Sequence, residues 1–197
     1  MSGSTLLVVG LVWGGLAFAE NGISVRVCNS VHIPDKILDQ SKAEASFVLK
    51  TGGLTVTWLD CSTETMEQEL GPRDFVLCLV AFRLSGADHP GRRTMGSTSI
   101  ANRMEQNSVF VHYDLITRTA SDHGAECQVY QILGYSIAHE LGHLLLGGEH
   151  TRRGVMRAVW GSADLLLMSK REIKFTPEER ERVLQALEAR VQTWLNK

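Results

Sequence analysis

The chain has 197 residues, the usual size of one globular domain and enough to bury a sizeable hydrophobic core. Its composition, 44% hydrophobic and 21% charged, is ordinary for a soluble globular protein. The formal net charge of −2 excludes a general electrostatic attraction to nucleic acid or to a membrane surface, so we expect neither as a partner.

The N-terminal segment has the pattern of a secretory signal peptide. Residues 6–18 form a short apolar run, and the small-x-small sequence AFA at positions 17–19 predicts cleavage after Ala19. No Lys or Arg precedes the run, and a membrane anchor is the alternative, although the run is short for a bilayer span. We therefore expect residues 1–19 to be removed and residues 20–197 to form a single domain. The mature chain would be secreted or periplasmic, with no stable membrane span.

The mature part begins with a strand, a helix and a second strand. Residues 23–27 and 54–58 alternate apolar and polar side chains, which is typical of half-buried strands. Between them, residues 34–50 have a helical apolar pattern that begins at a proline and ends before two glycines. This order and spacing predict a right-handed parallel crossover.

Three further strands are predicted before the most informative stretch. Residues 75–84 form a nearly continuous apolar run, typical of a central strand that is buried on both faces. Residues 94–101 predict a short edge strand, and residues 109–116 predict another strand. Residues 114–126 then lead into a long helix.

That helix, over about residues 127–146, carries apolar residues at helical spacing and contains the sequence His139-Glu140-Leu-Gly-His143. Side chains four apart lie on the same face of a helix, so the rings of His139 and His143 can meet one ion. Glu140 lies about 100° further round the helix, where its carboxylate can reach a water bound to the same ion. Two imidazoles and a carboxylate in this order are the arrangement of zinc hydrolases.

A catalytic zinc site usually has three protein ligands and one open position. Gly147 and Gly148 allow the helix to end and the chain to turn back sharply. The first side chains after that turn that can bind zinc are Glu149 and His150. We expect His150 to be the third ligand because neutral imidazole binds zinc well at neutral pH, and Glu149 is the alternative.

This stretch resembles the metzincin clan of zinc metallopeptidases, whose pattern is HExxHxxGxxH followed by a turn that contains a methionine. His139, Glu140 and His143 match the pattern residue for residue, and Met156 resembles the methionine of that turn. The stretch is also similar to small secreted bacterial proteins with the pattern HELGHLLLG…H…GxM…W, a match that includes Trp160.

The spacing departs from the metzincin pattern by one residue. The family glycine would fall at Leu146, but the glycine here is Gly147, and the third histidine is shifted equally, to His150. One extra helical residue before the turn explains both shifts and gives the variant spacing HExxHxxxGxxH. The family position of the third ligand is occupied by Glu149, which keeps Glu149 open as the alternative.

The order of elements also resembles a metzincin catalytic domain. After the methionine we expect a turn of helix over residues 163–169 and a C-terminal helix that begins with the capping-box pair Thr176 and Glu179. The predicted fold is α+β, an α/β-like sandwich with a mixed twisted sheet of about five strands, an early helix, a metal-binding helix and a C-terminal helix. In the family, the edge strand that corresponds to the region of Thr94 lines the cleft and pairs with extended substrate.

The four cysteines are Cys28, Cys61, Cys78 and Cys127. In an exported chain they permit two disulfides in three connectivities, and none has the CxxC spacing of a cysteine zinc site. We expect at least one bridge and assign no pair. Cys78 lies inside an apolar run and is equally consistent with a buried free thiol.

Other candidate residues are expected to have ordinary roles. We expect the remaining histidines to be solvated or hydrogen-bonded rather than metal ligands: His32, His89, His112 and His123. We expect Trp160 to pack in the structure rather than contact substrate. We expect Arg152 and Arg153 to lie in a solvated loop at the rim of any cleft. Glu172 would be a third ligand of the type used by the other large zinc-peptidase clan, but no helix with the right flanks precedes it.

The predicted function is that of a secreted zinc-dependent metalloendopeptidase acting on peptide or protein substrates. The expected cofactor is Zn2+, held by His139, His143 and His150, with Glu140 as the general base; no oligomeric state is assigned. Two alternatives stay open. One is a zinc hydrolase of a non-peptide substrate. The other is an exported binding or structural domain in which zinc only stabilises the fold, which a fourth ligand such as Glu149 would favour.

Overall fold

The structure is a computed structural model that describes residues 21–62, 68–82, 95–98, 107–123 and 127–197. Within these residues, five strands form one mixed sheet in the order β2-β1-β3-β5-β4. The strands are β1 (Gly22–Asn29), β2 (Thr55–Asp60), β3 (Asp74–Val80), β4 (Gly96–Thr98) and β5 (Ser108–His112). Four of them run parallel, and β4 pairs antiparallel with β5 at the edge of the sheet. The predicted mixed sheet of about five strands is confirmed.

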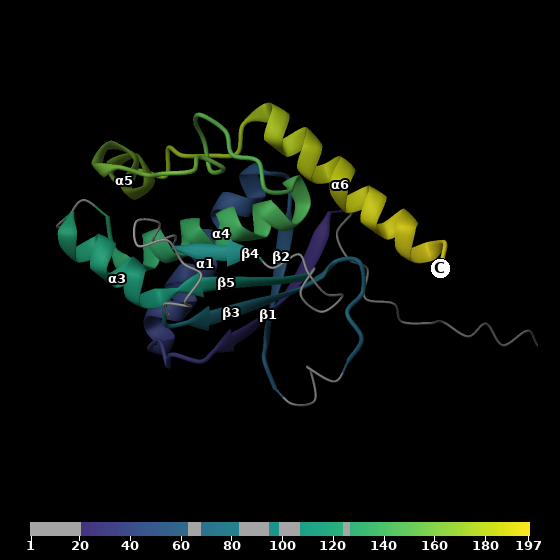
Figure 1. The fold of residues 1–197 in the computed structure, drawn as a ribbon, viewed down its shortest axis with the longest axis horizontal. Helices are drawn as coiled ribbons and strands as arrows, with labels where there is room; N and C mark the ends of the chain where they lie inside the picture. Colours follow the sequence, from purple (N-terminus) through teal and green to yellow (C-terminus); the bar gives the residue numbers. More distant parts are fainter. Residues whose placement is uncertain (1–20, 63–67, 83–94, 99–106, 124–126) are drawn as a thin grey trace, which may run out of the picture.

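The helices pack mainly beside one face of this sheet (Figure 1). They are α1 (Asp35–Thr51), α3 (Tyr113–Asp122), α4 (Val129–Leu146), α5 (Ser162–Ser169) and α6 (Pro177–Leu195). α1 joins the parallel strands β1 and β2, as the sequence predicted. α1 and α4 pack against each other, with α1 beside β2 and α4 beside β4 and β5. The early helix, the helix with the two histidines and the C-terminal helix are therefore all present.

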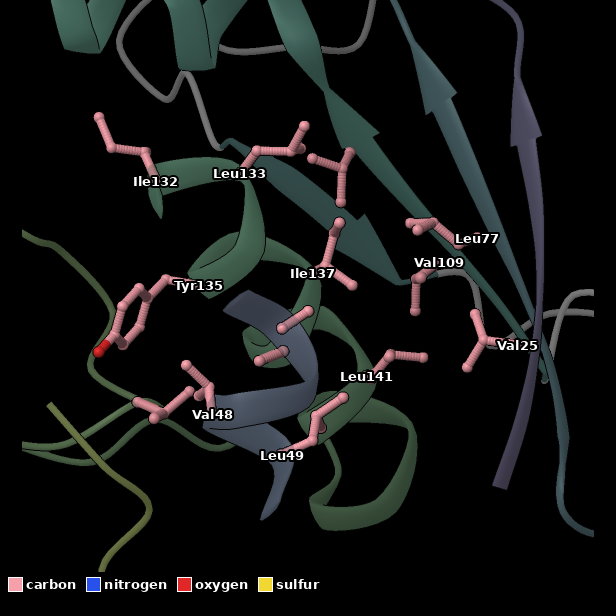
Figure 2. Close-up of a cluster of buried hydrophobic side chains, with 14 of the residues drawn as sticks. Val25, Val48, Leu49, Leu77, Val109, Ile132, Leu133, Tyr135, Ile137 and Leu141 are labelled. Atoms are coloured by element: carbon pink, nitrogen blue, oxygen red, sulfur yellow. The ribbon is translucent and has the colours of Figure 1, made fainter. Parts of the chain in front are cut away.

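The core lies between the sheet and the pair α1 and α4. Alternate residues of the central strands are buried there: Val25, Val27, Leu77, Leu79, Val109 and Val111. Figure 2 shows Ile137 and Leu141 of α4 in the same cluster as Val109 of β5 and Val48 and Leu49 of α1. Burial of each such side chain contributes about 1.5–3 kcal/mol to stability. Most residues of α4 are buried, which fits its apolar sequence.

A glycine lets α4 approach α1 closely. A Cβ on Gly134 would lie 2.6 Å from the Cβ of Glu44 and 2.9 Å from the carbonyl oxygen of Ser41. Glu44 is fully buried, and its carboxylate accepts hydrogen bonds from the guanidinium of Arg171, the shortest at 2.9 Å. The Tyr135 hydroxyl donates to the carbonyl of Ile173 at 3.1 Å. These contacts hold α4 along its length before the histidines are reached.

Two predicted boundaries were wrong. The strand expected over residues 109–116 ends at His112, and Tyr113 begins α3. Adjacent residues Leu115 and Ile116 are both buried, which one face of a helix allows, whereas a strand would point them to opposite faces. The strand expected over 75–84 ends at Val80, and residues 83 and 84 lie outside the described residues.

α6 begins with the predicted capping box, in which the side chains of Thr176 and Glu179 each accept a hydrogen bond from the other residue's backbone N–H. Its first turns pack on the body through Val183 and Leu187. The apolar spacing of Val183, Leu187, Val191 and Trp194 in the sequence predicts one face that packs on the body. For Trp194 this prediction was wrong, because its side chain is 47% exposed and the helix end extends past the sheet (Figure 1).

Cys28 and Cys61 form a disulfide with a Cα–Cα distance of 4.9 Å, which confirms that at least one bridge is present. Cys78 and Cys127 are free thiols. Cys127 is buried, whereas Cys78 is only half-buried. Among the described residues, no helix has the length and hydropathy needed to cross a membrane. The predicted signal segment and His89 lie outside the described residues.

Candidate metal centre

α4 places His139 and His143 one helical turn apart, as their spacing predicted. The Nε2 atoms of the two rings are 3.0 Å apart. His139 is buried and His143 is half-buried, because α4 rises out of the core toward its C-terminal end.

The third histidine comes from the loop that follows α4. The helix ends at Leu146, and Gly147 has φ 82° and ψ −170°, a backbone conformation that is essentially restricted to glycine. The chain then turns back and brings the Nε2 atom of His150 to 3.2 Å from the Nε2 atom of His143. The three histidines form a group whose nitrogen atoms all lie within 4.8 Å of one another. His150 is exposed, so the cluster opens to solvent on its side.

Backbone carbonyls set the tautomers of the two helical histidines. The Nδ1 atoms of His139 and His143 lie 2.8 Å from the carbonyl oxygens of Val155 and Gly147, respectively. A carbonyl oxygen only accepts hydrogen bonds, so each Nδ1 carries the proton and each neutral ring keeps a lone pair on Nε2. Such outer hydrogen bonds orient imidazole ligands in metal sites.

This geometry fits a zinc ion. A tetrahedral zinc with Zn–N bonds of about 2.0–2.1 Å places its ligand nitrogens about 3.3 Å apart, close to the 3.0 Å and 3.2 Å seen here. Nitrogen lone pairs converging at this distance need a cation or a proton between them. Burial lowers the pKa of His139 to about 4 and also lowers the pKa of His143, so a proton is disfavoured at neutral pH. The nearby imidazoles add to both shifts, whereas the hydrogen bonds to the backbone carbonyls oppose them.

Glu149, the alternative third ligand, points elsewhere. Its carboxylate is exposed and pairs with Arg182 at 3.4 Å. Among the described residues, the only group of three or more side chains arranged to hold a metal is that of the three histidines, and it includes neither Glu149 nor Glu172. No fourth side chain of the described residues joins the three histidines.

Glu140 lies against the edge strand, a contact that the sequence analysis missed. A Cβ on Gly96 of β4 would be 2.5 Å from both the Cγ and Oε1 atoms of Glu140. The Glu140 side chain is buried, so the backbone of β4 forms part of the wall beside its carboxylate. An isolated glycine inside a predicted strand is a signal of such a close approach, and it was available in the sequence.

Met156 packs against the helix that carries His139 and His143. Its side chain is fully buried, and its sulfur would be 2.5 Å from a Cβ on Gly142, the residue before His143. Gly142 was not singled out by the sequence analysis, yet its missing side chain is what lets the sulfur reach the helix. The backbone of Val155 donates to the carbonyl of Lys174 at 3.3 Å and holds the methionine turn in place.

Trp160, Arg152, Arg153 and His123 take the ordinary roles expected of them. The indole ring of Trp160 packs edge-on against the His139 ring, with the ring centroids 5.3 Å apart. Arg152 and Arg153 are exposed on the loop that follows His150. The side chain of His123 lies 3.0 Å from the hydroxyl of Ser162.

Comparisons with known proteins give a structural likeness only. No protein-family model and no curated protein matches the sequence. The fold is similar to the crystal structure of archaemetzincin from Methanopyrus kandleri, with a TM-score of 0.52 and 19% sequence identity over 86% of this chain and 97% of that one. At this identity the likeness establishes the fold, which is the mixed α/β fold of archaemetzincin, and His139, His143 and His150 form a cluster within it that is consistent with a zinc site.

Proposed function

We propose that this protein is a zinc-dependent metalloendopeptidase of the metzincin type. The observation that carries the proposal is the convergence of three imidazoles, His139, His143 and His150, on one point beside the helix that also bears Glu140. The donor set is three imidazole nitrogens with no fourth protein ligand among the described residues, which is the composition of catalytic rather than structural zinc sites.

The chemistry divides between the metal and the protein. When bound, zinc supplies Lewis acidity, which makes water a nucleophile near neutral pH and polarises a peptide carbonyl. Glu140 acts as the general base, since its ionised carboxylate accepts a proton from the attacking water and passes it to the leaving amine. The packing of Gly96 against Glu140 holds that carboxylate in one place and limits its alternative rotamers.

The position of β4 supports a peptide as the substrate. β4 is the last strand in the sheet order and lies directly beside Glu140. An edge strand can bind an extended peptide through backbone hydrogen bonds, and such binding would place a peptide bond next to the carboxylate. Hydrolysis of a non-peptide substrate would not use backbone hydrogen bonds of this kind.

We also propose that the protein is exported, to the periplasm or out of the cell. The apolar run over residues 6–18 supports this proposal, and so does the Cys28–Cys61 disulfide. Such bridges persist in oxidising compartments and are rare in the cytosol. N-terminal sequencing of the mature protein, with Glu20 as the expected first residue, tests the cleavage site.

The function is tested by measuring zinc content and casein cleavage for the wild type and for Glu140→Ala. We expect both to contain about one zinc per chain, and only the wild type to cleave unfolded casein in a chelator-sensitive way. Loss of a general base costs about 10²–10⁴-fold in rate. The matched control is Glu149→Ala, which removes the exposed neighbouring carboxylate and should keep full activity.

Each of the other outcomes favours a different function for this protein. Zinc in both proteins with cleavage by neither contradicts the peptidase and favours a domain that zinc only stabilises. Zinc with hydrolysis of a simple ester but not of casein favours a hydrolase of a non-peptide substrate. Absence of stoichiometric zinc from the wild type contradicts the whole proposal.

A further inference from the structure

The loop that carries His150 needs an anchor. Residues 147–150 are exposed and lie outside any helix or strand, so little packing restrains the His150 ring. Thr151, the next residue, makes hydrogen bonds through both its backbone N–H and its side chain. Its backbone N–H donates to the carbonyl of Met156 at 2.9 Å, which closes the turn that contains the methionine.

The side chain of Thr151 reaches a buried carboxylate on another element. Its hydroxyl lies 2.8 Å from the Oε1 atom of Glu179 and 2.7 Å from the carbonyl oxygen of Arg153, so two acceptors share its proton. Glu179 is 2% exposed, and its other oxygen, Oε2, accepts the backbone N–H of Thr176 at 2.8 Å. One carboxylate therefore caps α6 with one oxygen and holds the loop with the other.

A second contact seats the same loop on the same segment. Gly154 has φ 83°, and a Cβ there would lie 2.9 Å from the carbonyl oxygen of Lys174 and 3.3 Å from Oε2 of Glu179. The loop thus packs directly on the chain that leads into α6. A buried carboxylate requires hydrogen-bond donors, so separating Thr151 from Glu179 is costly.

We propose that Glu179 is a positioning residue for the third metal ligand and acts through Thr151. By fixing the residue after His150, the carboxylate holds the His150 ring near His143 before any metal arrives. Preorganisation of this kind raises affinity because less chain has to be ordered on binding. The inference rests on the proposed function only in taking His150 as a zinc ligand.

The test compares zinc affinity with metal-free stability in two variants. Thr151→Val keeps the side-chain shape but removes the hydroxyl that donates a hydrogen bond to Glu179. Thr176→Ala removes the hydroxyl that caps α6 and leaves the Thr151–Glu179 bond in place. We expect Thr151→Val to weaken zinc binding about 10–100-fold in a chelator competition, the usual effect of losing an outer hydrogen bond. Thr176→Ala should lower the metal-free melting temperature and leave zinc affinity unchanged.

Further variants keep the result decisive. Thr151→Ser retains the hydroxyl and should bind zinc like the wild type, and if Thr151→Val does not fold, Thr151→Ala against Thr151→Ser makes the same comparison. Equal zinc affinity for Thr151→Val and the wild type overturns the inference, as does an equal loss in Thr176→Ala. If the wild type itself binds no zinc, it is the proposed function that fails.

An independent observation concerns three cysteines at the same level of the sheet: Cys28 on β1, Cys78 on β3 and Cys61 directly after the end of β2. Cys28 of β1 is in register with Cys78 of β3. On its other side, Val27 is in register with Asp60, and the backbone N–H of Cys61 donates to the carbonyl of Val27 at 3.3 Å, so Cys61 lies beside Cys28. In-register residues of parallel strands point to the same face of a sheet.

Cys28 thus has two partners in matching positions, although it is bonded only to Cys61. Adjacent strands are about 4.8 Å apart, which lies within the Cα–Cα range of disulfides, and the existing bridge spans 4.9 Å. We infer that the Cys28 bridge can be exchanged from Cys61 to Cys78. The Cys78 thiolate attacks Sγ of Cys28, the Cys28–Cys78 bond forms as the Cys28–Cys61 bond breaks, and Cys61 leaves as a thiolate that takes up a proton.

Cys61→Ser and Cys28→Ser, each refolded in a glutathione redox buffer, test this inference. In Cys61→Ser we expect a mapped Cys28–Cys78 bridge and one free thiol, that of Cys127. In Cys28→Ser, Cys61 and Cys78 lie two strands apart, about 9.6 Å, so we expect no bridge. Three free thiols, or a glutathione adduct, in Cys61→Ser overturn the inference. Burial raises the pKa of the Cys78 thiol, which slows exchange at neutral pH. In wild type at pH 9, peptide mapping should therefore detect some molecules with the Cys28–Cys61 bridge and others with the Cys28–Cys78 bridge.

Discussion

The candidate metal centre has a helical half and a loop half, and the two are held in place by different interactions. His139, Glu140 and His143 lie on α4, which is fixed by its own backbone hydrogen bonds and by burial between α1 and the sheet. His150 lies on an exposed loop, and the residue after it, Thr151, is held by hydrogen bonds to Met156 and to Glu179, which lies 28 positions further along the chain. Ligands on a packed helix are therefore positioned by the core, whereas the loop ligand is positioned by a few specific polar contacts.

The largest expected effect tests the helical half through the core beneath it. Leu141 is 1% exposed and lies between His139 and His143 on α4, so Leu141→Ala should cost about 2–5 kcal/mol of unfolding free energy. The control Leu166→Ala changes a side chain that is 43% exposed on α5 and should cost about 0.5 kcal/mol or less. Urea unfolding of the metal-free proteins measures both. Equal costs would contradict the account of α4 as the buried support of the centre.

The next prediction tests the loop half directly. His150→Ala should weaken zinc binding by more than the roughly 100-fold that loss of a supporting hydrogen bond costs, because a ligand itself is removed. Glu149→Ala should leave zinc affinity unchanged, because that carboxylate pairs with Arg182 at the surface. Chelator competition measures both affinities. If Glu149→Ala is the variant that loses zinc, the third ligand has been assigned to the wrong residue.

A smaller effect is expected where the edge strand meets Glu140. Gly96→Ala places a methyl group where the Glu140 side chain lies, so the carboxylate must move. A displacement of about 1 Å at a reacting group costs on the order of 10²-fold in rate, and we expect a fall in kcat with zinc content unchanged. Gly161→Ala is the matched control, because a Cβ there meets nothing within 4 Å. Equal kcat for Gly96→Ala and the wild type would show that β4 does not position the carboxylate.

The smallest predicted effect is on the pH dependence of the metal-free protein. The pKa of His139 falls from 6.5 to about 4 on folding, with burial as its main cause, so the unfolded chain binds more protons between these values. Stability is then complete above about pH 6.5 and falls on acidification, by about 1 kcal/mol between pH 7.5 and 5.5 for this one group. Urea unfolding at the two pH values measures the loss, and His139→Gln should show less of it. An equal pH dependence in that variant would assign the titration to other groups.

Sequence alone predicted the helical half well, because two histidines four apart on an apolar helix have only one relative arrangement. The clustering of His150 with His139 and His143 also followed from the paired glycines and from the short segment between His143 and His150. The contacts of Gly96 with Glu140 and of Thr151 with Glu179 did not follow, because each joins segments far apart in the chain. The Cys28–Cys61 pairing depended on strand register in the same way, and register is a property of the assembled sheet.

The wrong boundaries have a related cause. Residues 109–116 are as apolar as a strand requires, but Leu115 and Ile116 are buried together from a helix, and only the surrounding fold selects between the two structures. At the C-terminus, Trp194 continues the helical apolar pattern past the point where α6 has a body to pack against.

X-ray absorption spectroscopy of the purified protein at the zinc edge tests the central claim most directly. The account predicts about one zinc per chain, with a first shell of nitrogen and oxygen at about 2.0–2.1 Å and outer-shell scattering from three imidazoles. His150→Ala should reduce that scattering to two imidazoles. A shell of sulfur at about 2.3 Å, imidazole scattering unchanged in His150→Ala, or no stoichiometric zinc would contradict the account.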